Sequence, residues 1–161
     1  MYYIIRYIFI QQVPAVREPP GLLRSDFKRP DGLTLYPWSK GKCLVWDYTC
    51  SDTLAPSHVG STSMEAGKSA AQAEKRKLSH YQELSHNYTI VPVATETLGS
   101  WGKQGLQFIK DIGQRIADIN GDKRSTCFLF QSIGMAIQRG NAASITGTIP
   151  NMKRLHELYY L

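Results

Sequence analysis

The chain has 161 residues, of which 42% are hydrophobic, and a formal net charge of +6. This length suits one domain with a modest core and excludes two independent cores. The hydrophobic content excludes a wholly disordered chain. The positive charge favours a polyanionic partner, because Lys and Arg side chains neutralise phosphates. We therefore expect one basic folded domain for which DNA is a candidate partner.

The cysteines exclude two other classes of protein. There are three of them, Cys43, Cys50 and Cys127, and no CxxC pair occurs. An odd count without metal-ligand spacing argues against both a disulfide framework and a zinc site, and the four histidines show no ligand spacing either. A reducing compartment, the nucleus or the cytoplasm, is therefore expected.

The first ten residues, MYYIIRYIFI, are apolar but are interrupted by Arg6. This run is too short to span a bilayer, and no small-residue cleavage site follows it. We interpret residues 1–18 as a strand-like extension or as the start of a truncated reading frame. The rest of the sequence predicts no transmembrane segment, so no membrane partner is expected.

The first elements predicted are two adjacent strands. Residues 14–30 are rich in proline, which indicates an extended entry segment. Residues 31–36 predict a short strand, and 37–41 predict a turn. Residues 42–50 are almost continuously apolar or aromatic, which predicts a strand buried on both faces. The alternation of side chains along it groups on one face Cys43, Val45, Asp47 and Thr49.

The next segment predicts a loop and a helix. Residues 51–66 are rich in Ser, Thr, Gly and Pro, which is typical of a surface loop. Residues 67–84 predict a helix, because Ala, Glu, Gln, Lys and Leu dominate them. Its inward stripe consists of Ala70, Ala73, Lys77, Tyr81 and Leu84.

A third strand and two further helices complete the chain. Residues 88–96 predict a strand, in which Pro92 indicates an edge or a bulge. Residues 102–119 predict an amphipathic helix, and 124–139 predict a second one that is interrupted at Gly140. This order predicts an α/β (α+β) domain in which a small mixed sheet is flanked by helices, two of them C-terminal.

Asp47 is the most unusual residue, because an unpaired carboxylate inside a hydrophobic strand is energetically costly. Three explanations stay open: it pairs with a basic residue, it caps a neighbouring turn, or it binds a metal. Asp31 opens the preceding strand, so a hairpin of the two strands would bring both carboxylates together. Two carboxylates with water are usual ligands of Mg²⁺ in sites that cleave phosphodiesters. Asp31 and Asp47 are therefore the candidate ligands for Mg²⁺ (or Mn²⁺).

The sequence RPD at 29–31, the D-x-T at 47–49 and the lysine-bearing helix that follows resemble the PD-(D/E)xK nuclease superfamily. Four stretches are similar to the restriction-like endonuclease domain that follows the reverse transcriptase in some non-LTR retrotransposons. They are KRPDGLTLYPW (28–38), GKCLVWDYT (41–49), VATETLGSWG (93–102) and AIQRGNAASITGT (136–148). The resemblance covers about 19–148 and leaves 149–161 as a tail. It implies a restriction-endonuclease-like fold, Mg²⁺-dependent nicking of DNA, and a reverse transcriptase domain as a partner in the parent polyprotein.

The resemblance also implies a catalytic lysine, and here the chain departs from the pattern. The superfamily places this lysine two residues after the second acidic residue, where Thr49 stands. Lys77 on the following helix is the candidate replacement, although it could equally be a surface lysine. Glu74 could support Lys77 or the metal. Glu96 could be a third acidic ligand or could be hydrogen-bonded to the turn that follows it.

Five basic residues are candidate phosphate contacts: Arg29, Lys68, Lys75, Arg76 and Arg139. A solvated helix face would show the same residues, but Arg139 lies where a helix end is expected, which suits phosphate. Our first hypothesis is thus a metal-dependent DNA endonuclease domain of mobile-element origin. The alternatives are a catalytically degenerate nucleic-acid-binding module and a truncated fragment of a retrotransposon polyprotein without function.

Overall fold

The computed structural model describes residues 14–22 and 29–148. The described strands form one sheet in the order β1-β2-β3-β4. They are β1 (Ala15–Arg17), β2 (Gly32–Ser39), β3 (Lys42–Ser51) and β4 (Tyr88–Glu96). The helices are α2 (Val59–Thr62), α3 (Lys68–His80), α4 (Lys103–Asn120) and α5 (Ser125–Gly147), with 3-10 turns η1 (Pro20–Leu22) and η2 (Gln82–His86).

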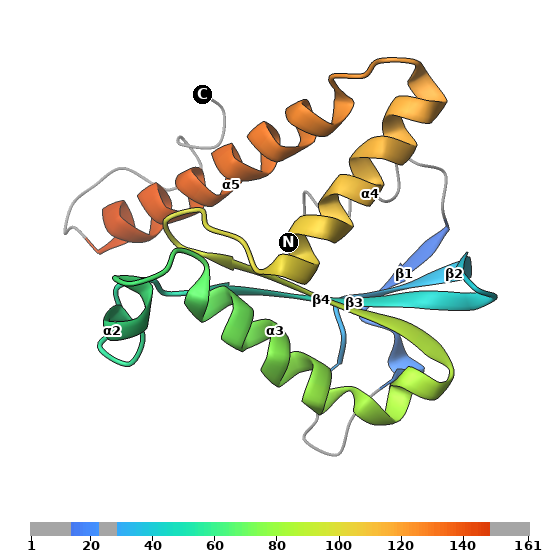
Figure 1. Cartoon of the computed structure of the whole chain (residues 1–161), viewed down its shortest axis with the longest axis horizontal. Helices are drawn as coiled ribbons and strands as arrows, with labels where there is room; N and C mark the ends of the chain where they lie inside the picture. The colour runs from blue at the N-terminus through green and yellow to red at the C-terminus, as the bar shows by residue number, and fades with distance from the viewer. Residues whose placement is uncertain (1–13, 23–28, 149–161) are drawn as a thin grey trace.

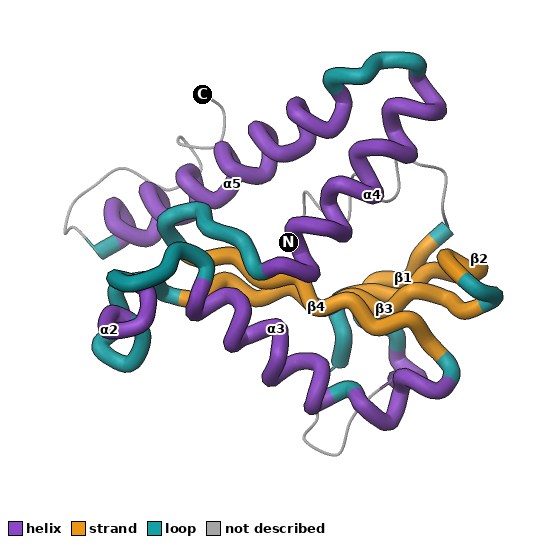
Figure 2. The backbone as a smooth tube through the Cα atoms, viewed as in Figure 1, coloured by secondary structure: helices purple, strands orange, loops and turns teal. Residues whose placement is uncertain are grey.

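The sheet is mixed. β1 pairs antiparallel with β2, and β2 pairs antiparallel with β3, whereas β3 and β4 run parallel. A parallel pair needs a crossover connection, and α3 lies within this one. Figures 1 and 2 show α3 on one face of the sheet and the α4–α5 pair on the other. The predicted α/β class, a small mixed sheet flanked by helices, is confirmed.

Alternate residues of the strands face two different layers. The larger core cluster joins the sheet to α4 and α5 and contains Leu44, Trp46, Val93, Phe108, Ile109, Ile112, Leu129 and Ile133. The smaller cluster contains only Ala70, Ala73 and Ala94, which bring α3 against the sheet. Because alanine side chains are small, α3 can approach the sheet closely, and longer polar side chains on the same stripe reach β3.

Several predicted elements match the structure. The strand expected at 88–96 is β4, and its place at the edge of the sheet explains how Pro92 is tolerated. The helix expected at 102–119 is α4, which ends at Asn120 and is followed by Gly121 in the left-handed conformation. The two strands expected at 31–36 and 42–50 form the β2–β3 hairpin, but β2 continues to Ser39, so the turn expected at 37–41 is shorter than predicted.

The predicted second C-terminal helix was too short. Gly140 does not interrupt α5, which continues to Gly147. The Asn141 side chain donates a hydrogen bond to the Thr97 carbonyl at 2.6 Å, and this contact ties the extended part of α5 to the end of β4. Tertiary contact therefore outweighs the local preference for a break.

Other boundaries also differ. The helix expected at 67–84 ends at His80 and continues as the 3-10 turn η2, and the loop expected at 51–66 contains α2. The sheet begins before residue 19, because β1 pairs with β2. The expectations for residues 1–13 and for the tail 149–161 lie outside the described part of the chain.

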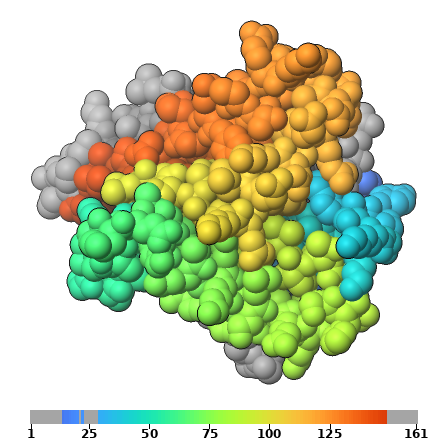
Figure 3. All heavy atoms as spheres, viewed as in Figure 1, coloured from blue at the N-terminus to red at the C-terminus, as the bar shows by residue number. Residues whose placement is uncertain are grey.

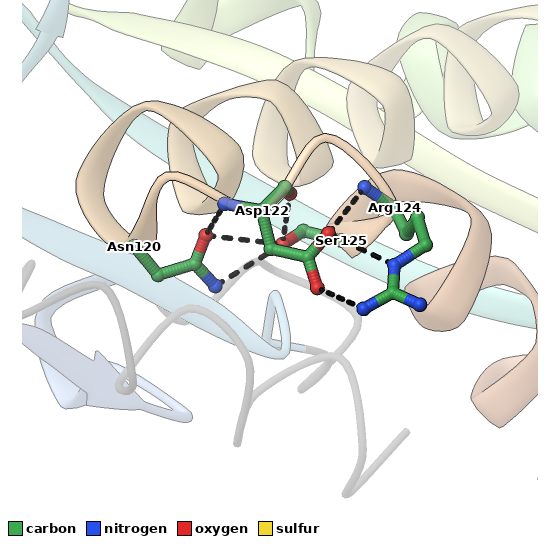
Figure 4. A network of polar contacts seen from close by, with 4 residues as sticks. All are labelled: Asn120, Asp122, Arg124 and Ser125. Carbon is green, nitrogen blue, oxygen red and sulfur yellow. Dashed lines mark hydrogen bonds and ion pairs between the residues drawn. The ribbon is translucent and has the colours of Figure 1, made fainter.

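The connection between α4 and α5 is a compact polar turn (Figure 4). The Asn120 side chain accepts a hydrogen bond from the Asp122 amide at 2.9 Å. Asp122 in turn accepts one from the Arg124 amide at 2.9 Å, and the Ser125 hydroxyl donates to the Asp122 carbonyl at 2.7 Å. These bonds reverse the chain so that α5 packs back onto α4.

Gly32 provides the room for Trp46, its partner across the hairpin. A Cβ atom at position 32 would overlap the Trp46 indole, which is 1% exposed. We expect Gly32→Ala to lower the free energy of unfolding by about 1–3 kcal/mol in urea denaturation, the usual cost of overpacking. Gly134→Ala is the control, because a Cβ there meets nothing within 4 Å. Equal stability of the two variants would contradict this account.

Candidate functional site

The hairpin register brings Asp31 to Asp47. Gly32 pairs with Trp46, so Asp31, the residue just before β2, lies beside Asp47, the residue after Trp46 in β3. The Tyr48 amide donates a hydrogen bond to Asp31 Oδ2 at 2.6 Å. The two carboxyl groups are close enough that the Asp47 carboxylate raises the pKa of Asp31. The expectation that the two aspartates meet is therefore confirmed.

Asp47 is held from α3. Its side chain is 7% exposed, and its Oδ2 atom accepts hydrogen bonds from Lys77 Nζ at 2.6 Å and from the Tyr81 hydroxyl at 2.7 Å. Lys77 and Tyr81 are one helical turn apart and therefore point the same way. The predicted direction of the Lys77 amine is confirmed. Of the three explanations for a buried Asp47, the structure shows pairing with a basic residue.

The electrostatics of Asp31 reflect this crowding. Burial raises the pKa of Asp31 from its ordinary 3.8 to about 6, the Tyr48 amide opposes this shift, and the nearby Asp47 carboxylate adds to it. The Lys77 ammonium group lowers the pKa but does not offset the burial. Asp31 thus lies where a second positive charge would be favourable at neutral pH.

The donor set fits a hydrated Mg²⁺ ion. Oδ2 of each aspartate accepts hydrogen bonds from protein donors, which fix the position of each carboxyl group. Mg²⁺ commonly takes one or two protein carboxylates and fills the remaining positions with water and phosphate oxygens. Within residues 14–22 and 29–148, no group of three or more His, Cys, Asp or Glu side chains could hold a metal ion. A metal here would rest on Asp31, Asp47 and solvent.

Glu74 and Glu96, which we expected to assist the site, have other partners. Glu74 accepts hydrogen bonds from the backbone amides of Gln104 and Gly105 at 3.1 and 2.7 Å, in the first turn of α4. Glu96 Oε1 accepts two from Ser69, from its amide and its hydroxyl, both at 3.0 Å, in the first turn of α3. Each carboxylate satisfies free amides at a helix start. Both residues therefore lie outside the candidate site.

A glycine precedes each helix that Glu74 or Glu96 caps. The residues before α3 and α4 are Gly67 and Gly102, and neither has a capping side chain. A Cβ atom at Gly102 would overlap the Glu74 carboxylate. The glycine therefore leaves room for an acidic side chain from another helix to enter.

Because Glu74 and Glu96 cap helices and do not contact the aspartates, replacing either should lower stability without changing metal binding. Glu74→Gln and Glu96→Gln should each lower the free energy of unfolding by about 1–2 kcal/mol, because a neutral amide interacts less strongly with helix amides. The Mn²⁺ affinity of the folded proteins, measured by calorimetry, should equal that of the parent. Weaker Mn²⁺ binding by either variant would return that residue to the metal site.

The candidate phosphate contacts divide between two faces. Arg29 is exposed next to Pro30 and Asp31, and Lys75 and Arg76 are exposed on α3. The atoms of α3 (green) form a broad surface in Figure 3. Lys68, at the start of α3, is paired with Glu65 at 2.7 Å. Arg139 is exposed on α5, on the other side of the sheet, and α5 does not end near it as expected.

The role of Tyr81 was not predicted from the sequence. The periodicity placed Tyr81 on the inward stripe of the helix, but gave no partner for its hydroxyl group. The sequence did contain a signal for this role, because Tyr81 follows Lys77 by four residues and lies on the same helix face, the one that faces Asp47. A buried tyrosine needs a partner for its hydroxyl, and a buried aspartate needs donors.

No protein-family model matches the chain, and no matching sequence is found among curated proteins. The three cysteines are free thiols. In the described part of the chain, no helix has the length and apolar character needed to cross a membrane.

Proposed function

We propose that this chain is a metal-dependent DNA endonuclease domain of mobile-element origin, similar to the PD-(D/E)xK domains that accompany reverse transcriptases. The observation that carries the proposal is the meeting of Asp31, Asp47 and the Lys77 amine at one point of the sheet. Two adjacent carboxylates beside a half-exposed lysine form a usual arrangement for phosphodiester cleavage.

Each residue has a distinct task. Asp31 and Asp47 would hold Mg²⁺, while protein donors fix Oδ2 of each carboxyl group. When bound, Mg²⁺ supplies charge neutralisation and an activated water. The Lys77 side chain is 28% exposed, so its ammonium group can contact a phosphate oxygen at the surface and stabilise negative charge as it develops.

The surface around the site suits a DNA backbone. Arg29 is exposed beside Asp31, and Lys75 and Arg76 are exposed on the helix that carries Lys77. Phosphate contacts of this kind position the duplex without reading its sequence. DNA is thus the proposed substrate, a reverse transcriptase domain in the parent polyprotein is the proposed partner, and a reducing compartment suits the free thiols.

A second candidate is a nucleic-acid-binding module that has lost its activity. The observation that favours it is Thr49, which occupies the superfamily's lysine position two residues after Asp47. In that case the basic surface would still bind DNA, but the chain would cleave nothing.

A plasmid-nicking assay separates these candidates. We expect the full chain to convert supercoiled plasmid to the open circular form with Mg²⁺ or Mn²⁺ and not with EDTA. Asp31→Asn, purified in parallel, is the control for a contaminating nuclease. It is preferable to a change at Asp47, because Asp31 is less buried and asparagine has the same shape. DNA binding without cleavage by the parent would favour the binding module.

A further inference from the structure

We infer that Tyr81 is a positioning residue that holds Asp47 permanently, so that Lys77 is free to leave Asp47 for the DNA phosphate. The inference rests on the proposed function and assigns a division of tasks within the same site. Its basis is that two donors from α3, only one of them charged, meet the same carboxylate oxygen.

The two donors differ in burial. Tyr81 is 2% exposed, and its hydroxyl donates to Asp47 Oδ2 at 2.7 Å. The Lys77 side chain is 28% exposed, and its ammonium group has three hydrogens, of which the bond to Asp47 uses one. Of the two groups, only the lysine has both access to solvent and spare donors. It is therefore the one that can reach a substrate.

Backbone hydrogen bonds hold Tyr81 at the end of α3. Tyr81 is the C-cap residue of α3, and its amide donates to the Lys77 carbonyl at 3.0 Å. Its aromatic ring has two side-chain torsions, whereas lysine has four, so holding its hydroxyl in place costs little entropy. The hydroxyl group is thus a rigid donor, which suits a constant anchor.

Asp47 needs such an anchor because it is almost fully buried. If Lys77 were its sole donor, movement of the ammonium group to a phosphate would leave a buried carboxylate oxygen without a hydrogen bond, at a substantial energetic cost. With the Tyr81 bond in place, Oδ2 keeps a partner and the carboxyl group of Asp47 keeps its orientation. Lys77 can then move without turning Asp47.

Mn²⁺ binding, measured by calorimetry or by the electron paramagnetic resonance signal of the free ion, tests this division. Tyr81→Phe should weaken Mn²⁺ binding by about 10-fold, the usual effect of losing a hydrogen bond that orients a ligand. Lys77→Met should strengthen it by about threefold or more, because a competing positive charge is removed. The two substitutions should change the Mn²⁺ affinity in opposite directions only if Tyr81, and not Lys77, holds Asp47 in place.

Thr95→Val is the matched control. It removes the Thr95 hydroxyl, which forms a hydrogen bond of 2.7 Å with the Tyr48 hydroxyl on the face of β3 opposite Asp47. It should lower stability but leave Mn²⁺ affinity unchanged. Unchanged Mn²⁺ binding by Tyr81→Phe, or no Mn²⁺ binding by the parent, would overturn the inference. If Tyr81→Phe fails to fold, the Lys77→Met protein is sufficient for the test. Loss of Mn²⁺ binding by that protein would show that Lys77, and not Tyr81, holds Asp47.

Nicking by the same proteins separates this inference from the proposed function. If the parent nicks plasmid, Tyr81→Phe should lower the rate by about 10-fold or more with DNA affinity unchanged. The parent could bind Mn²⁺, and the two variants could change the Mn²⁺ affinity in opposite directions, while no protein nicks DNA. In that case the nuclease proposal fails, but the role of Tyr81 as the residue that holds Asp47 is supported.

Discussion

Replacing Lys77 with alanine should lower the rate of Mg²⁺-dependent nicking by about 10²-fold or more, the usual cost of losing a group that stabilises the transition state. Its ammonium group lies 2.6 Å from Asp47 Oδ2 and is the cation that α3 brings to the two aspartates. Thr49, at the superfamily's lysine position, is uncharged and cannot replace it. DNA affinity should change little, because transition-state contacts affect turnover more than binding.

The control for this prediction is Lys110→Ala. Lys110 is exposed on α4, across the sheet from Asp47, so the variant removes one positive charge without touching the site. Single-turnover nicking and DNA affinity should be measured for both variants and the parent. Similar nicking rates for Lys77→Ala and Lys110→Ala would reduce Lys77 to a structural partner of Asp47.

The part of the site that the sequence predicts well depends on β-strand geometry. A strand has a strict period of two, so a short turn between 31–36 and 42–50 leaves few registers, and the aspartates converge in the one observed. The same periodicity separates Asp47 from Trp46 and thereby assigns one face to α3 and the other to the larger core. Lys77 follows from helical spacing once α3 lies on the Asp47 face.

The part that the sequence does not predict depends on partners from distant elements. Glu74 and Glu96 cap helices that begin about thirty residues away from them, and local capping patterns hold no trace of such pairs. The position before each of these helices is glycine, which is a weak capping signal by itself. A buried acidic residue is therefore ambiguous until its partner is known, because metal ligands and remote caps have the same pattern.

The length of α5 was mispredicted for a related reason. Gly140 costs helix stability, so a local analysis ends the helix there. In the fold, Asn141 hydrogen-bonds to Thr97 and Ala143 is buried, so packing maintains the helix beyond that point. This correction also removes the helix end that had made Arg139 a favoured phosphate contact.

Asp31→Asn should lower the nicking rate by more than about 10²-fold, because replacing a residue that only orients a metal ligand already lowers activity by up to that factor. At pH 8 and without metal, the same variant should have a higher melting temperature than the parent. Asparagine can still accept the Tyr48 amide hydrogen, and its own NH₂ group can donate to Asp47, where the parent has two facing carboxylates. The inactive variant would then be more stable than the parent, so misfolding could not explain its loss of activity.

The pH dependence of this gain follows from the raised pKa of Asp31, 3.8 in its ordinary state and about 6 in the fold. Folding favours the protonated acid, so the parent loses stability as pH rises from about 4 to about 6 and stays lower above that range. Asparagine carries no charge at any of these pH values. The difference in melting temperature should therefore be near zero at pH 4 and complete above pH 7. Because Asp31 is partly exposed, solvent screens much of the cost, and we expect a gain of about 2–4 °C. Melting curves in EDTA across this range are the measurement, and a gain that is the same at pH 4 and pH 8 would show that Asp31 ionises normally.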